Sequence, residues 1–328
     1  MQEGGGAHTI ATMSGAQQQH AGTSGVTLAG ISLRNPVVLA AGTCGYADEM
    51  ADVLDLSKVG AVITKSITPE AREGNAPWRI VGTERGMLNA IGLANVGLEA
   101  FLREKAPKAA GAATVVFASA AGHSVEDYVR VAGALDGMFP AIELNVSCPN
   151  TKDGLVFGED PNELAGLLAE VRPAVRTSKL IVKLSPNAPS IVRMAEAAVA
   201  GGADCLSLIN TFTAMAIDVE TRRPVIANGT AGLSGPGTHP IAVRMTWDVY
   251  RQVAKSAGVP VLAYGGVMKW QDAAELILAG ATAVGMGTAL FVDPRLPVQI
   301  ARGLEGWRVR QGARSFAELT GAYEAPRK

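Results

Sequence analysis

The stretch PVLAYGGVMKWQDAAELILAGATAVGMGT, residues 260–288, contains the pattern that decides the fold. A short apolar run (260–264) is followed by Gly265-Gly266, then by a helical pattern that ends at Gly280, and then by a second apolar run (282–286). Glycine commonly follows the last turn of a helix, because it adopts the left-handed conformation without a steric penalty. The stretch therefore predicts one strand–helix–strand unit.

The same pattern recurs along the chain from about Val26. Eight apolar runs are rich in β-branched residues, and they are 37–41, 61–65, 114–118, 141–145, 180–184, 205–210, 260–264 and 282–286. Their hydrophobicity is continuous rather than alternating, which is typical of parallel strands covered on both faces. Helical patterns fill the gaps, and the capping sequences DPNE (160–163) and SFAE (315–318) each predict a helix start.

Eight strand–helix units predict an α/β fold, and specifically a closed (β/α)8 TIM barrel. A doubly wound open sheet has the same local pattern and stays an alternative. The intervals 66–112 and 211–259 are longer than a simple crossover and predict extra loops or hairpins over the C-terminal mouth of the barrel. We expect residues 26–328 to form a single domain, and residues 1–25, which include glycine and glutamine runs, to form a flexible leader.

Charge and cysteine content exclude several classes of protein. Lys+Arg 29 against Asp+Glu 30 gives a net charge of -1, which argues against a nucleic acid or an anionic membrane recognised by bulk charge. Cys44, Cys148 and Cys205 are too widely spaced for a four-thiolate zinc site or an iron–sulfur cluster. His123 and His239 have no metal-ligand spacing, so no metal is expected.

The chain is expected to be cytoplasmic and to have no contact with a membrane. Three isolated cysteines fit a reducing compartment, and no secretory signal is visible at the N-terminus. The uncharged run 276–292 approaches the length of a membrane span. Gly280, Gly285 and Gly287 divide it at turn-like spacing, which indicates a helix end, a strand and a loop instead.

Polar residues gather at the predicted strand ends, which meet at one mouth of a barrel, where the active sites of this fold lie. They include Thr43, Ser66, Ser119, Asn145, Asn210 and Thr211. Hydroxyls and glycines are expected wherever a strand leaves the core. Lys65 and Lys183 are less easily explained in that way, because a buried ammonium group needs a partner. We therefore interpret both lysines as functional.

Glycines after the last two strands suggest a phosphate site. Gly265-Gly266 and Gly287-Thr288 would let backbone N–H groups approach a phosphate, and loops at these positions form the usual phosphate site of such barrels. Gly285-Met286-Gly287 lacks the third glycine of a dinucleotide fingerprint, so a Rossmann-type NAD site is not expected.

Cys148 lies in NVSCPN (145–150), directly after the fourth run. A free thiol has a reference pKa near 8.5, close enough to neutral for general-base catalysis if the site stabilises the thiolate. A free cysteine is more often a small buried hydrophobe, which suits Cys44 and Cys205. For Cys148 a position between two asparagines favours a catalytic role. Gly154 and Gly158 would allow the following segment to move as a lid.

Seven motifs occur in order between about Val26 and Leu304: AAGT (40–43), REGN (72–75), GMLNAIGL (86–93), NVSCPN (145–150), VKLSPN (182–187), SLINT (207–211) and GLSGP (232–236). Together they resemble the catalytic subunits of class 1B dihydroorotate dehydrogenases, FMN enzymes of pyrimidine synthesis. KDG (152–154) with FG (157–158), and TRRP (221–224), resemble class 1B more than the fumarate-using class 1A. A cysteine where membrane-associated class 2 enzymes have serine points the same way.

The resemblance implies that Cys148 removes a proton from C5 of dihydroorotate while a hydride leaves C6 for flavin N5. It implies substrate contacts at Lys65, Asn89, Ala90, Ile91, Gly92, Leu93, Asn145, Asn150, Asn210 and Thr211. It implies FMN contacts at Ala41, Gly42, Lys65, Ser66, Ser119, Asn145, Lys183, Ile209, Gly235, Gly265, Gly266, Gly287 and Thr288. Ala41 stands where serine is common and Ser119 where asparagine is common, which puts side-chain hydrogen bonds to FMN at these two positions in doubt.

The resemblance also implies partners. Electrons would pass to an iron–sulfur flavoprotein subunit that carries FAD and a [2Fe–2S] cluster and reduces NAD+, and the catalytic subunits would pair as a homodimer within a heterotetramer. Two alternatives stay open: an FMN oxidoreductase like dihydropyrimidine dehydrogenase, and a lyase or isomerase barrel in which Lys183 or Lys65 forms a Schiff base. A non-catalytic binding barrel is less favoured, because it leaves the polar mouth without a use.

Overall fold

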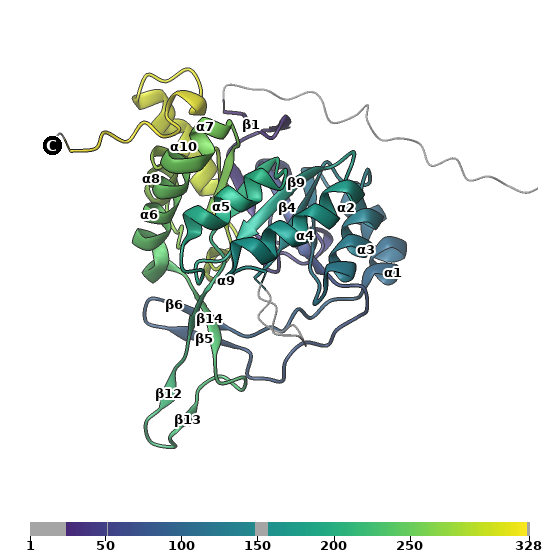
Figure 1. Ribbon diagram of the computed structural model, residues 1–328. Helices are drawn as coiled ribbons and strands as arrows, with labels where there is room; N and C mark the ends of the chain where they lie inside the picture. Colours follow the sequence, from purple (N-terminus) through teal and green to yellow (C-terminus); the bar gives the residue numbers. More distant parts are fainter. Residues whose placement is uncertain (1–23, 51, 148–156, 327–328) are drawn as a thin grey trace, which may run out of the picture.

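The computed structural model describes residues 24–50, 52–147 and 157–326, and these residues form a closed barrel of eight parallel strands surrounded by helices (Figure 1). Each strand of the barrel pairs with the next one along the chain, and the last pairs with the first. The predicted (β/α)8 barrel is confirmed, and the open-sheet alternative is wrong.

The eight predicted runs coincide with the eight strands. These are β3 (Val37–Leu39), β4 (Ala61–Ile67), β7 (Val115–Ala120), β8 (Ala141–Asn145), β9 (Lys179–Leu184), β10 (Cys205–Leu208), β15 (Val261–Tyr264) and β16 (Ala283–Met286). Successive residues of a strand point to opposite faces. Val37 and Leu39 accordingly pack in the outer hydrophobic cluster under the helices, whereas Val38 packs in the barrel interior with Ile63 and Phe117.

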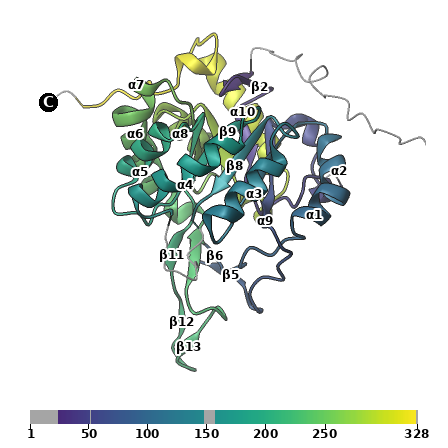
Figure 2. The same cartoon turned by 45° about the vertical axis from the view of Figure 1, so that its right-hand side comes forward.

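Helices cover the outside of the barrel (Figures 1 and 2). They are α1 (Leu98–Ala100), α2 (Ala106–Ala110), α3 (Val125–Leu135), α4 (Pro161–Ala174), α5 (Ile191–Ala200), α6 (His239–Val249), α7 (Lys255–Ala257), α8 (Trp270–Leu278), α9 (Ala289–Val292) and α10 (Leu296–Arg310). The run 276–292 is thus the end of α8, strand β16 and the short α9. No helix among residues 24–50, 52–147 and 157–326 has the length and apolar character needed to cross a membrane.

One predicted helix cap is confirmed and one is wrong. The Asp160 carboxylate accepts a hydrogen bond of 2.7 Å from the backbone N–H of Asn162 at the start of α4. Ser315 precedes only a single 3-10 turn, Phe316–Glu318, and makes no capping hydrogen bond. The Glu318 carboxylate turns instead to Arg314, whose backbone N–H and Nε donate to it at 3.1 and 2.8 Å.

The two long intervals form additional strands at the carboxyl end of the barrel, as predicted. A four-stranded antiparallel sheet has the order β11 (Phe212–Ala214), β14 (Ala231–Ser234), β6 (Gly86–Asn89), β5 (Ile80–Thr83). A further hairpin, β12 (Ile217–Asp218) and β13 (Arg223–Pro224), extends away from the barrel (Figure 1).

The opposite end of the barrel is closed by a hairpin of β1 (Val26–Leu28) and β2 (Ile31–Leu33). Leu28 and Leu33 are fully or almost fully buried against the interior residues of the barrel strands. Figures 1 and 2 show this hairpin on the side of the molecule away from the four-stranded sheet. The extra sheet and the strand ends therefore define one functional end.

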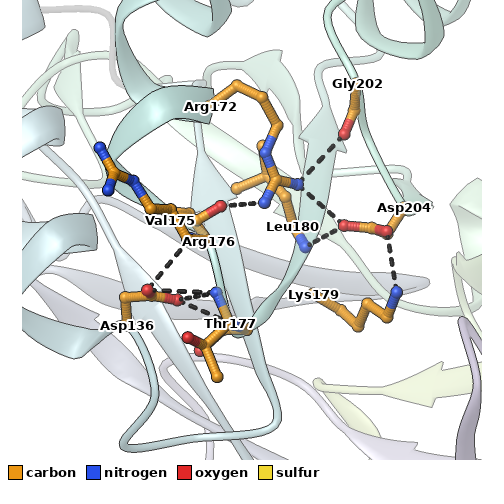
Figure 3. A network of polar contacts seen from close by, with 10 residues as sticks. Asp136, Arg172, Val175, Arg176, Thr177, Lys179, Leu180, Gly202 and Asp204 are labelled. Atoms are coloured by element: carbon orange, nitrogen blue, oxygen red, sulfur yellow. Dashed lines mark hydrogen bonds and ion pairs between the residues drawn. The ribbon is translucent and has the colours of Figure 1, made fainter.

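Two aspartates fix the connection between α4 and β9 (Figure 3). The Asp136 carboxylate accepts hydrogen bonds from the backbone N–H groups of Arg176, Thr177 and Ser178 at 2.7–3.2 Å. The Asp204 carboxylate accepts from Arg172, from Lys179 and from the backbone N–H of Leu180 at 2.9–3.2 Å. Burial raises the pKa of Asp136, but the backbone donors outweigh it and hold that pKa below its usual range.

The Asp136→Ala variant is expected to lose about 1.5–3 kcal/mol of unfolding free energy at pH 7, the range for hydrogen bonds to a charged group. Because the folded-state pKa is lowered, this stabilisation is present above the unfolded pKa and is lost as the pH falls through the folded one. Urea denaturation of the protein at pH 7 and near pH 3 measures it, with the exposed Glu170→Ala of α4 as control. An equal loss at both pH values contradicts this account.

Candidate functional site

A cavity of about 470 Å³ lies at the carboxyl ends of the barrel strands, under the four-stranded sheet. Its lining comes from strands β4, β8, β9, β15 and β16, from the loops after β3, β10, β15 and β16, and from Met87, Asn89, Leu233 and Ser234 of the sheet. Ligand sites of this size are typical of small molecules and cofactors. The sheet therefore covers a site that the strand ends build.

Two lysines project into this cavity from barrel strands. Burial, with a smaller contribution from the Arg79 guanidinium, lowers the pKa of Lys65 below its ordinary value. Lys183 is only 7% exposed, and its Nζ lies 3.5 Å from Glu143 Oε1 and 4.6 Å from the centre of the Tyr264 ring. The partner that a buried lysine requires is therefore present for Lys183.

A chain of hydrogen-bonded side chains crosses the floor of the cavity. The Asn210 amide donates to Asn145 Oδ1 at 3.1 Å, and the Asn145 amide donates to Ser66 Oγ at 3.3 Å. The hydroxyls of Ser66 and Ser119 are hydrogen-bonded at 2.9 Å. Because each amide both donates and accepts, the chain fixes the direction of its remaining donors and acceptors. Such a surface suits a flat ring edged with carbonyl and N–H groups.

Glycines after β15 bring backbone close to the cavity. Gly265 and Gly266 have φ of 144° and 65°, and a Cβ atom at Gly266 would lie 2.6 Å from the Gly235 carbonyl oxygen. His239 Nδ1, at the start of α6, donates to the Gly265 carbonyl oxygen at 2.7 Å. Thr288 Oγ1 donates to Ser234 Oγ at 2.7 Å on the other side. Closely approaching loops of this kind can offer backbone N–H groups to an anion.

The structure brings most of the predicted site residues together around this cavity. Those on its lining are Ala41, Gly42, Lys65, Ser66, Asn89, Ile91, Leu93, Asn145, Lys183, Ile209, Asn210, Thr211, Gly235, Gly265, Gly266, Gly287 and Thr288. Three are placed elsewhere: Ser119 is buried behind Ser66, and Ala90 and Gly92 do not line the cavity. Cys148 and Asn150 lie outside the described residues.

Several residues on and below the cavity lining were not predicted from the sequence. Arg79, Tyr264 and Phe291 line it, and Glu143 lies beneath Lys183. Glu143 carried the same signal as the lysines, a charged residue within an apolar run. Arg79 had no such signal, because it lies in an irregular segment whose place is set only by tertiary structure. Cys44 and Cys205 are buried as predicted, and burial raises the pKa of the Cys44 thiol to about 12.

Comparison with known proteins shows which proteins have sequences similar to this one. The family model described as "Dihydroorotate dehydrogenase" matches residues 24–307. The catalytic subunit of dihydroorotate dehydrogenase B (NAD(+)) from Trichlorobacter lovleyi is 48% identical over 302 residues, 91% of this chain and 98% of that one. The proteins of the same name from Geotalea daltonii and Bacteroides fragilis are 50% and 43% identical, covering 90% and 91% of this chain and 97% and 98% of their own.

Proposed function

Because the chain belongs to the dihydroorotate dehydrogenase family, we propose that this cavity oxidises (S)-dihydroorotate to orotate in de novo pyrimidine (UMP) biosynthesis, with FMN as cofactor. The observation that carries the proposal is the combination, in one cavity, of two lysines, a chain of amides and a lining of closely packed glycine loops. A planar ring with carbonyl groups, a carboxylate and a phosphate needs these three features.

The residues around the cavity fit FMN. The close backbone at Gly265, Gly266 and Gly235 leaves no room for a Cβ and suits the phosphate end, with Gly287 and Thr288 beside it. Lys183 supplies a buried positive charge, and Ala41, Gly42, Ser66 and Ile209 would contact the ring. FMN, when bound, supplies the acceptor for the hydride of C6. Ser119 would act through Ser66 rather than by direct contact.

The substrate is expected to be held by amides and lysine. Asn89, Asn145, Asn150 and Asn210 would read the ring edge, while Lys65, Thr211, Ile91 and Leu93 would bind the carboxylate side, with Ala90 and Gly92 acting only through the backbone of their segment. Cys148 would take the proton from C5. Burial and the Arg79 guanidinium lower the pKa of Lys65, because both disfavour its charged form. A substrate carboxylate bound beside Lys65 would stabilise the charged ammonium group again.

We propose that electrons leave the chain through a partner subunit. The relatives are named as catalytic subunits of an NAD(+) enzyme, and we propose the same arrangement here. The partner would be an iron–sulfur subunit with FAD and a [2Fe–2S] cluster that reduces NAD+, and the complete enzyme a heterotetramer built on a homodimer of catalytic subunits. We propose further that residues 26–328 act as one FMN-binding domain after a leader, and that the reaction takes place in the cytoplasm, as the cysteine usage suggests.

The absorption spectrum of the purified chain tests the function. We expect flavin bands that bleach when dihydroorotate is added anaerobically, and no bleaching with dihydrouracil. A colourless protein that FMN does not reconstitute, or bleaching by dihydrouracil alone, would contradict the proposal. Trapping of a sugar phosphate by borohydride without flavin would favour the lyase alternative.

Gly266→Ala tests the proposed phosphate end. A methyl group there would lie 2.6 Å from the Gly235 carbonyl oxygen and 2.9 Å from His239 Cβ. We expect FMN affinity to fall at least about tenfold, because a displacement of the backbone donors removes charge-assisted hydrogen bonds to the phosphate. The control is Gly258→Ala, which has nearly the same φ, 66° against 65°, but nothing within 4 Å of its Cβ. Equal FMN affinity in both variants, measured by fluorescence titration, would exclude a role for this loop.

A further inference from the structure

A fully buried carboxylate lies inside the barrel beneath the proposed flavin site. Glu143, on β8, is 0% exposed and does not line the cavity. Its Oε2 accepts hydrogen bonds from Ser207 Oγ at 2.9 Å and from the Tyr264 hydroxyl at 3.3 Å. Its Oε1 lies 3.5 Å from Lys183 Nζ and has no hydrogen-bond partner among the described residues. The carboxylate is thus directed at Lys183, whose side chain does line the cavity.

The groups that surround Glu143 make Lys183 its only positive neighbour among the described residues. Burial, followed by the charge of Glu143, raises the pKa of Tyr264 well above its ordinary value, so its hydroxyl is a neutral donor. Burial, again followed by Glu143, raises the pKa of the Cys205 thiol, which also stays neutral. A buried carboxylate is costly unless it is paired. The negative charge of Glu143 and the positive charge of Lys183 therefore offset each other.

This pairing limits the positive charge that Lys183 presents to the cavity. A lone ammonium beside a flavin would favour the reduced form, which carries more negative charge than the oxidised form. A carboxylate 3.5 Å behind the ammonium offsets part of that preference. In the absence of the carboxylate, the flavin would accept electrons more readily and release them less readily.

We propose that Glu143 is a positioning residue that, through Lys183, lowers the reduction potential of bound FMN, so that the chain passes electrons on instead of retaining them. The inference rests on the proposed function, because it concerns the same flavin site. It adds a residue from beneath the cavity whose role is to tune the cofactor rather than to touch it.

The reduction potential of FMN-loaded Glu143→Gln tests this inference. Glutamine keeps the shape of the side chain and removes its charge. We expect the affinity for reduced FMN to increase at least tenfold relative to the affinity for oxidised FMN. For a two-electron couple, a tenfold change raises the reduction potential by about 30 mV. Glu143→Asp keeps the charge but withdraws it from Lys183 by one methylene, and its potential is expected to lie between wild type and Glu143→Gln. An unchanged potential in Glu143→Gln overturns the inference.

Two further measurements separate tuning from a structural role. In a double-mutant cycle with Lys183→Met, the Glu143→Gln shift is expected to shrink, because the carboxylate acts through Lys183; additive shifts overturn that part. Asp204→Asn is the matched control, because it removes a carboxylate that pairs at 3.2 Å with Lys179, which lies on β9 like Lys183 but does not line the cavity. This variant should leave the reduction potential of FMN unchanged. An equal shift in this control overturns the inference.

The test also remains decisive if Glu143→Gln does not fold. Glu143→Asp then takes its place, with an expected threefold shift, about 14 mV, and an unchanged potential overturns the inference. The potential is measured with a chemical reductant and a reference dye, and without dihydroorotate. Failure of the proposed function would appear as absence of FMN or as no reduction by dihydroorotate, which is a different result.

Discussion

The Cys148→Ser variant is expected to keep its FMN while dihydroorotate reduces the flavin about 10²- to 10⁴-fold more slowly at neutral pH, the usual contribution of a general base. A thiol with a reference pKa near 8.5 can supply a thiolate near neutrality. A serine hydroxyl is a far weaker acid and does not supply an alkoxide there. The slow rate should rise with pH more steeply in the variant than in the wild type. Stopped-flow absorbance under anaerobic conditions measures it.

Cys44→Ser is the control for this experiment. The Cys44 thiol is buried and does not line the cavity, and burial raises its pKa to about 12, so it has no thiolate to lose at neutral pH. Its reduction rate should stay within a few-fold of wild type. If Cys148→Ser reduces as fast as Cys44→Ser at pH 7, another group takes the C5 proton.

The Lys183→Met variant should show the largest combined effect on cofactor binding and stability. It leaves Glu143 buried without its cation, which costs about 3–5 kcal/mol of unfolding free energy in comparable pairs. It also removes a charged donor from the cavity, and we expect FMN affinity to fall about 10- to 100-fold. Urea denaturation of the apoprotein gives the first quantity free of ligand stabilisation, and fluorescence titration gives the second.

Lys179→Met separates these effects from the loss of any lysine on β9. Its side chain is 45% exposed and pairs with Asp204 at 3.2 Å. An exposed pair of this kind contributes up to about 1 kcal/mol. We expect normal FMN content and nearly normal stability. If Lys183→Met has the same flavin content and stability as Lys179→Met, the pair of Lys183 and Glu143 contributes neither to FMN binding nor to folding stability.

The sequence predicted the barrel because its signals are local. Continuous apolar runs such as 180–184 and caps such as Asp160 depend on neighbours within a few residues, and they reappear in β9 and α4. The Ser315 cap failed because the following segment makes only one turn and Glu318 binds Arg314 instead. A capping pattern predicts where a helix begins, but it does not predict how long the helix is in the packed structure.

The site was predicted where strand ends gather and was missed where contacts span long separations. Asn145 and Lys183 could be placed from their strands, but the pairing of Asn89 with Gly232 joins segments that share no local pattern. Glu143 carried a signal as a charged residue in an apolar run, but its contacts could not be predicted, because the chain does not reveal which polar groups share a layer of the barrel interior. Its partners Ser207 and Tyr264 are 64 and 121 residues away.

The antiparallel pairing of β6 with β14 has a consequence for biosynthesis of the molecule. Asn89 and Gly232 are aligned across this pairing, so the cover of the cavity is assembled from both halves of the polypeptide. A ribosome must deliver residues up to Ser234, and the last two barrel strands after them, before the pocket is complete. The yellow colour of bound FMN should therefore develop late in synthesis, and nascent chains that stop before β14 should bind no FMN and remain colourless.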